Sequence, residues 1–429
     1  MSTATQEARL PRGVGRLTRG WTIFILAMVA ISALGWIAYI REFTQGMTVT
    51  GMRNVGTMGG ATWGLYITFV VYFVGVSFAG ITIAAVIRLF KLDHLRPLAR
   101  MAEVLTVVSL ILGAIAIVAD LGQPLRGMIN LFRYARPQSP FFGTFTLVIS
   151  GYLFASLVYL WLTSRRDAAV LAQRPSRLRW IHKIVAAGYT DTPAERERHS
   201  KTTFWLAISI LPMLVVAHST LGFVFGLQVG RPGWYSALQA PAFVVLAGVS
   251  GTGVLIVLAA IVRKMMVRDV GLNLQVFAWL GRFLMLLLFV YVYFMVTELL
   301  TSTYAGSERE LQVTREMLWG EYSWIFWSAV IMLVIPLLGL TIQAIRRSWS
   351  IPWLVVSGIA VNLGAIGKRY LIAVPSQTHG QLLPYVDGSY TPTWVEFAVV
   401  ASLLAFGALV IGVFMKVLPI VELEETGHA

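Results

Sequence analysis

Long apolar runs separated by short polar segments dominate the pattern along this chain. Ten runs are mostly apolar over about 18 residues or more, the length with which an α-helix crosses about 30 Å of hydrocarbon. Since apolar and polar residues do not alternate within them, we predict helices rather than barrel strands. The predicted spans are Trp21–Ile40, Trp63–Phe90, Leu98–Ala119, Phe142–Ser164, Phe204–Val224, Ala242–Val262, Val276–Leu300, Ser323–Ile345, Ile351–Val374 and Thr393–Val417.

The composition supports a chain whose main solvent is lipid. Of the 429 residues, 57% are apolar and only 13% are charged, whereas soluble domains are about a quarter charged. The fold class that follows is an all-α polytopic membrane protein. The chain contains no cysteine, which excludes disulfides, cysteine-ligated iron–sulfur clusters and thiolate catalysis within it.

The net charge of +14 is concentrated in the segments that share one side of the predicted membrane. The positive-inside rule therefore places both termini in the cytoplasm of a bacterial inner-membrane protein. Residues 1–20 would form a basic cytoplasmic N-terminus, 21–417 the membrane domain with a cytoplasmic loop at 165–203, and 418–429 a cytoplasmic tail. This charge favours membrane lipid as a partner and gives nucleic acid little support.

A basic stretch in the long cytoplasmic loop has apolar residues interleaved with its cations. It reads "RLRWIHKIVA" from Arg177 to Ala186. This pattern predicts an interfacial helix on the anionic leaflet, and a docking site for a cytoplasmic partner is the alternative.

Ionisable side chains lie at or inside the ends of several spans, all toward the outer face in this topology. Each costs about 2.5–3.5 kcal/mol on insertion scales when it lies deep in the bilayer, so each needs a partner or a role. The alternative is contact with lipid headgroups, but five spans that bring polar groups to a similar depth favour a shared polar cavity. These residues are Asp120, His218, Glu298, Lys368, Arg369 and Glu396.

His218 is the only one of the six histidines within a span. A haem buried between membrane helices takes two facing histidines, so we expect no haem in this chain. A packed core histidine and a hydrogen-bond or proton partner in the cavity are both open. Glu103, near the cytoplasmic start of the third span, would begin a proton path or act as a helix-end carboxylate beside Arg100.

Six segments carry motifs that recur in a fixed order in one family of membrane proteins. They are "TWGLYITFVVYFVGVSFAG" (62–80), "ADLGQPLR" (119–126), "AHSTLGFVFGLQVGRPGWYSALQAPAFVV" (217–245), "TELLTSTYAG" (297–306), "VNLGAIGKRYLIAVPS" (361–376) and "YTPTWVEF" (390–397). Together they resemble the polysulfide reductase membrane subunit family, also called NrfD-like. The ten-span branch of that family includes membrane subunits of sulfite-reduction-associated complexes, hydrogenases and alternative complex III.

The resemblance implies two four-helix bundles, spans two to five and six to nine, with spans one and ten flanking them. It also implies a menaquinone or ubiquinone site near the outer face and no haem or iron–sulfur cluster bound by this chain. A four-cluster ferredoxin-like iron–sulfur subunit would dock on that face, with a multihaem cytochrome or molybdopterin catalytic subunit beyond it. The family's quinone-site positions match Asp120, His218, Glu298 and Arg369, and Tyr235 stands where the family often has histidine.

We therefore predict a quinone- or quinol-interacting membrane subunit of a respiratory electron-transfer complex, with proton translocation as an added possibility. Asp120 and Glu298 would exchange protons and His218 would hydrogen-bond the quinone, while Arg126 and Arg369 would orient it. The full set of predicted quinone-site residues is Asp120, Arg126, His218, Tyr235, Glu298 and Arg369. The predicted proton path is Glu103, Asp120, Glu298 and Glu396. A secondary transporter and a purely structural anchor are the alternatives.

Overall fold

The computed structural model describes residues 13–52, 60–134, 138, 146–266, 271–380 and 387–423. Ten helices in these ranges are long and apolar enough to cross a membrane, and the same ranges contain no strand. The predicted all-α polytopic membrane fold is confirmed. The outer parts of the two predicted terminal segments, 1–12 and 424–429, lie outside the described residues, as do the first residues of the predicted span Phe142–Ser164.

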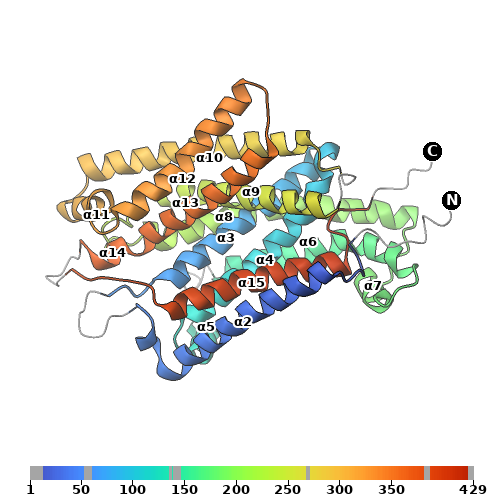
Figure 1. The fold of residues 1–429 in the computed structure, drawn as a ribbon, viewed down its shortest axis with the longest axis horizontal. Coiled ribbons are helices and arrows are strands. Elements are labelled where there is room, and N and C mark those ends of the chain that lie inside the picture. The colour runs from blue at the N-terminus through green and yellow to red at the C-terminus, as the bar shows by residue number, and fades with distance from the viewer. Residues whose placement is uncertain are drawn as a thin grey trace.

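Each predicted span corresponds to one long helix, and four short α-helices lie between them in the described part of the chain (Figure 1). The long helices are α2 (Arg19–Gln45), α3 (Leu65–Leu89), α4 (Arg96–Asp120), α6 (Thr146–Ala172), α8 (Pro193–Gly226), α9 (Gln239–Met265), α10 (Leu274–Tyr304), α12 (Ser323–Ile345), α13 (Ile351–Ala373) and α15 (Trp394–Val417). The short ones are α5 (Pro124–Tyr134), α7 (Arg179–Ala186), α11 (Glu308–Leu318) and α14 (Pro375–Thr378).

The largest difference in span ends is at α8, which begins well before the predicted Phe204. The polar run before Phe204 continues the helix, because Pro193 suits the first turn and the Thr192 side chain accepts a hydrogen bond from the Glu195 N–H. Much of the predicted loop 165–203 is therefore helical, and α7 covers part of the basic stretch predicted to form a helix.

The long helices pack in two closed circuits with a flanking pair. One circuit runs α3–α4–α6–α8, and the other runs α9–α10–α12–α13. The two circuits meet where α3 and α8 contact α9 and where α3 contacts α13. The flanking pair is α2 and α15, and α15 packs against α4 and α3. The circuits contain the same helices as the two four-helix bundles that the resemblance implies, and the bundle arrangement stays a prediction.

Helix α3 is the centre of the molecule and is buried along nearly its whole length. Small residues let its neighbours approach closely, as is typical of membrane helix interfaces. At Gly251 of α9, an added Cβ would lie 2.4 Å from the Val76 carbonyl oxygen of α3. Gly80 of α3 is equally close to the Ala102 carbonyl of α4. These close approaches fix α3 against both neighbours.

The two ends of the helical array are distinct (Figure 1). Both termini and α7 lie at one end, which we call the termini end. The short helices α11 and α14 lie at the other, which we call the α11 end.

Candidate functional site

At the α11 end, three helices bring together a carboxylate, an ammonium and an amide. Lys368 Nζ of α13 lies 3.8 Å from Glu298 Oε2 of α10, and Gln239 Nε2 of α9 donates to Glu298 Oε1 at 3.4 Å. The Lys368 side chain is 6% exposed and that of Glu298 is 36% exposed, so the pair reaches from the interior to the surface. A lysine ammonium has three N–H donors. Within the described ranges, none of them makes a hydrogen bond, since the Glu298 carboxylate lies beyond hydrogen-bond distance.

Arg369 occupies the junction of the two circuits, one residue further along α13. It is 3% exposed, its Nη1 donates to Ser250 Oγ at 2.8 Å, and its guanidinium lies 5.5 Å from the centre of the Tyr72 ring. The Tyr72 hydroxyl in turn donates to Asn362 Oδ1 at 3.0 Å. No described carboxylate lies within 4.0 Å of Arg369, so hydroxyl, carbonyl and aromatic groups hold this cation.

His218 of α8 also packs against α3. Its Nδ1 lies 2.8 Å from the Leu214 carbonyl oxygen of its own helix, and its Nε2 lies 2.8 Å from the Val74 carbonyl of α3. A neutral imidazole has one N–H and can donate to only one of these oxygens at a time. The ring also meets Phe78 edge-on. These contacts match the alternative of a packed core histidine, while its role as a quinone ligand stays a prediction.

Asp120 belongs to a separate polar group between α2, α3, α4 and α15. It is the last residue of α4 and lies near Tyr66 of α3. The Tyr66 hydroxyl donates to Glu42 Oε2 at 2.6 Å, and Glu42 of α2 is 2% exposed. The structure therefore places Asp120 beside a buried carboxylate–phenol pair rather than beside Glu298.

Glu396 is held by the chain around the first turn of α15. Its Oε2 accepts hydrogen bonds from the Gly51 N–H at 2.8 Å and the Thr393 N–H at 2.9 Å, and Thr393 and Glu396 form a capping box. The Tyr390 hydroxyl donates to its other oxygen. Burial and this carboxylate raise the pKa of Tyr390, which lies before the helix, so its hydroxyl stays protonated at neutral pH. These capping hydrogen bonds are enough to explain why Glu396 is buried, and its role in a proton path stays a prediction.

The remaining predicted residues lie apart from these groups. Tyr235 is 58% exposed, whereas its neighbour Trp234 is buried and donates from its indole N–H to the Ile372 carbonyl. Arg126 is exposed on α5 and lines a hollow of about 540 Å³ that also includes Met47. Glu103 lies at the termini end and is fully buried, so the structure does not bring it near the other site residues.

Several residues of these polar groups were not among the predicted quinone-site or proton-path residues, although Lys368 was expected in the shared polar cavity. Glu42 lies beyond the predicted end of its span, and α2 continues past it to Gln45. Lys368 carries a clear signal as a second charge beside Arg369, but its pairing with Glu298 depends on how α10 and α13 pack. Nothing in the sequence marks Gln239 or Tyr72 as site residues, because amides at helix starts and tyrosines within apolar runs are common. In the described ranges, no three His, Asp or Glu side chains gather as a metal site.

The chain is similar to several known proteins along most of its length. Residues 53–380 match the family model described as Polysulphide reductase, NrfD. A Halobacterium salinarum protein, provisionally named as a dimethyl sulfoxide reductase membrane subunit, is 31% identical, over 95% of this chain and 92% of its own. A selenate reductase subunit of Mesobacillus selenatarsenatis is 24% identical, over 94% and 95%. The Hdr-like menaquinol oxidoreductase integral membrane subunit of Archaeoglobus fulgidus is 22% identical, over 92% and 93%.

Proposed function

Because this chain belongs to the polysulphide reductase NrfD family, we propose that it is the quinone- or quinol-interacting membrane subunit of an oxidoreductase complex. It would exchange electrons between the membrane quinone pool and an iron–sulfur subunit docked at the α11 end. The family match over most of the chain supports this role, as do the names of its relatives, which are subunits of reductases and of a menaquinol oxidoreductase. Menaquinone is the quinone that these names favour.

The observation that carries the proposal is the buried ammonium of Lys368 beside the half-exposed carboxylate of Glu298. Quinone reduction takes up two electrons and two protons. A Lys368 N–H would donate to a quinone carbonyl oxygen, and Glu298, at the surface end of the pair, would exchange a proton with water. Gln239 holds the carboxylate in place through its amide N–H. These three side chains suit a quinone head group because an ammonium donor and a carboxylate that can carry a proton meet there from three helices.

The arrangement around Arg369 supports the same location. A buried cation with no described carboxylate partner stabilises negative charge near it, and Arg369 lies on the same turn of α13 as Lys368. We propose that Arg369 stabilises negative charge that develops at the Lys368 site. Asp120, Arg126, His218 and Tyr235 stay predictions as further quinone-site residues.

The test compares quinol-linked activity with an activity that bypasses the quinone. Lys368→Met and Glu298→Gln are expected to lower electron transfer from quinol at least about tenfold, since each removes a group that acts in proton or charge stabilisation. Turnover of the purified complex with a soluble artificial electron donor should be unchanged. Lys264→Met, at an exposed lysine of α9 near the termini end, is the matched control. Full quinol activity in both site variants would instead support the structural-anchor alternative.

The proposed partner is tested by the subunits that purify with the chain. An iron–sulfur subunit rich in cysteine is expected, because this chain has none with which to ligate a cluster. A further subunit that carries the catalytic centre would identify the substrate. Purification of the chain from its native membrane without any redox subunit would contradict the proposal.

The remaining parts of the proposal concern placement in the cell. We propose that the membrane is the bacterial inner membrane and that the termini end is cytoplasmic, since basic residues gather at that end. The α11 end would then face outward, where the partner docks.

A further inference from the structure

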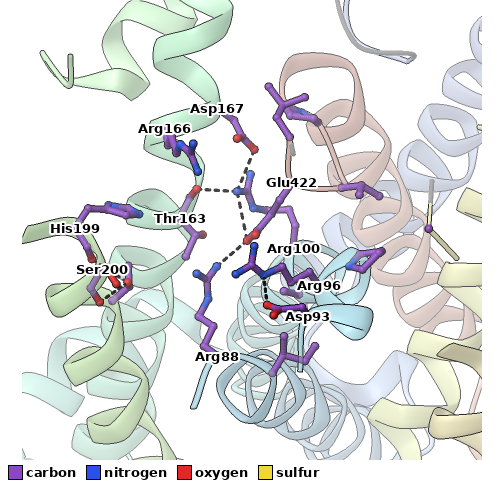
Figure 2. A pocket seen from close by; sticks show the side chains of 18 of the residues that line it. Arg88, Asp93, Arg96, Arg100, Thr163, Arg166, Asp167, His199, Ser200 and Glu422 are labelled. Atoms are coloured by element: carbon purple, nitrogen blue, oxygen red, sulfur yellow. Dashed lines mark hydrogen bonds and ion pairs between the residues drawn. The ribbon is translucent and has the colours of Figure 1, made fainter. Parts of the chain in front are cut away.

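A second polar site lies at the termini end, where α3, α4, α6 and α8 meet the C-terminal segment 419–423 (Figure 2). A cavity of about 1020 Å³ lies between these elements. Six cationic and three anionic side chains line it. The cations are Arg88, Lys91, Arg96, Arg100, Arg166 and Arg196, and the anions are Asp93, Asp167 and Glu422.

Arg100 is the most deeply buried of these cations, with 1% of its surface exposed. Its Nη2 donates to the Thr163 carbonyl oxygen at 2.7 Å and lies 3.3 Å from Asp167 Oδ2, and its Nε lies 3.6 Å from Glu103 Oε2. Its Nη1 and Nε make no hydrogen bond to any described residue. A buried donor left unsatisfied costs about 1–3 kcal/mol. Arg100 therefore has donors for oxygens that the described chain does not supply.

The chain itself already places an anion at this cavity. Glu422, in the segment that follows α15, has its Oε1 2.7 Å from Arg88 Nη2 and 3.9 Å from Arg100 Nη2. Arg88 also lies 3.2 Å from Glu103 Oε1, yet its Nε is buried without a hydrogen bond. The Glu422 side chain is 25% exposed, so an external anion can compete with it for Arg88.

We infer that this cavity binds a phosphate-bearing anion and that the Glu422 carboxylate is its competing intramolecular occupant. Guanidinium groups present N–H pairs that match the oxygens of a phosphate, and a phosphate offers more acceptors than one carboxylate. The inference does not depend on the proposed quinone role, which concerns the opposite end of the molecule.

The surroundings favour a lipid headgroup as the source of the phosphate. Ile87, Phe204 and Met266 line the same cavity, which suits a ligand with an apolar part. Nearby, α7 exposes Trp180 and Ile184 beside its cations, as a helix at the headgroup level does. Inorganic phosphate is the other source of the same chemistry.

The experiment titrates spin-labelled phosphatidylglycerol into the full-length protein reconstituted in phosphatidylcholine, and follows the immobilised lipid by electron paramagnetic resonance. Arg88→Gln and Arg100→Gln are each expected to weaken binding about fivefold or more, the change for one arginine near an anionic lipid. Glu422→Gln is expected to tighten binding, because it removes the competing charge. Arg282→Gln, an exposed arginine at the same end of the second circuit, is the matched control and should bind as the unmodified protein does.

Arg88→Gln is expected to weaken binding and Glu422→Gln to tighten it, whereas a folding defect would weaken binding in both variants. Both side chains are partly exposed, so neither substitution should unfold the protein. Binding that is equal in these two variants and the unmodified protein would overturn the inference and leave water as the content of the cavity. A second arm adds millimolar inorganic phosphate. Displacement of the spin label by phosphate identifies the free anion as the preferred ligand, whereas no displacement identifies the lipid.

Discussion

At the residue scale, the packing of Arg369 depends on the absence of a side chain at one position of α3. An added Cβ at Gly75 would lie 2.3 Å from Arg369 Nη2, closer than real Cβ contacts. Gly75→Ala would push the guanidinium away from Ser250, and loss of this buried hydrogen bond costs about 1–3 kcal/mol. We expect a lower thermal midpoint in detergent and reduced quinol activity. Gly20→Ala on α2, where an added Cβ has nothing within 4 Å, is the control and should leave the thermal midpoint and the quinol activity unchanged. A Gly75→Ala protein with an unchanged midpoint and activity would show that α3 does not fix Arg369.

His218 provides a second prediction at this scale. Since its ring fills the space between α8 and α3 and lies within hydrogen-bond distance of a carbonyl of each, His218→Ala is expected to destabilise the protein by about 2–4 kcal/mol. The measurement is thermal unfolding of the purified protein. Tyr235→Ala, at a 58% exposed side chain, is the control and should change the midpoint little. A His218→Ala protein that unfolds normally but loses quinol activity would instead favour the quinone-ligand role.

At the scale of the element, α15 depends on the carboxylate that caps it. Glu396→Gln keeps an oxygen for the Gly51 and Thr393 N–H groups, whereas Glu396→Ala leaves both unsatisfied. We expect the alanine variant to lose about 1–3 kcal/mol and the glutamine variant to stay close to the unmodified protein, as measured by thermal unfolding. If Glu396 only caps the helix, Glu396→Gln also keeps its quinol activity. If the Glu396→Gln protein is normally stable but loses quinol activity, the result would support the prediction that Glu396 belongs to the proton path.

The elements themselves were largely predictable, because a span needs an apolar run of fixed length whatever its neighbours are. The prediction was less complete where polar residues extend a helix, as before Phe204, and where a short amphipathic helix such as α5 or α11 follows a span. Within the candidate site, the depth of Glu298 follows from its position near the end of a span. Its pairing with Lys368 does not, since it depends on which faces of α10 and α13 meet. The partners of His218 are backbone carbonyls, which sequence patterns do not reveal.

At the scale of the whole molecule, buried charge occupies both ends of the helical array. At the α11 end, Glu298 and Lys368 sit where α10 meets α13, while at the termini end Arg88, Glu103 and Arg100 tie α3 to α4. Between them, α3 is apolar and tightly packed. The two groups lie at opposite ends and share no residues, so a quinone site and an anion site can coexist.

The arrangement predicts that the termini end faces the cytoplasm and that the α11 end faces outward. Because the chain has no cysteine, a single introduced thiol can report the side of the membrane on which it lies. Tyr304→Cys places a thiol at a 95% exposed position of the α11 end, and Lys264→Cys places one at an exposed position of the termini end. Since basic residues gather at the termini end, a membrane-impermeant maleimide added to intact spheroplasts should label only Tyr304→Cys. Both variants should label after the membrane is permeabilised, which controls for thiol reactivity. Labelling of Lys264→Cys alone in intact spheroplasts would invert the topology and would place the iron–sulfur partner in the cytoplasm.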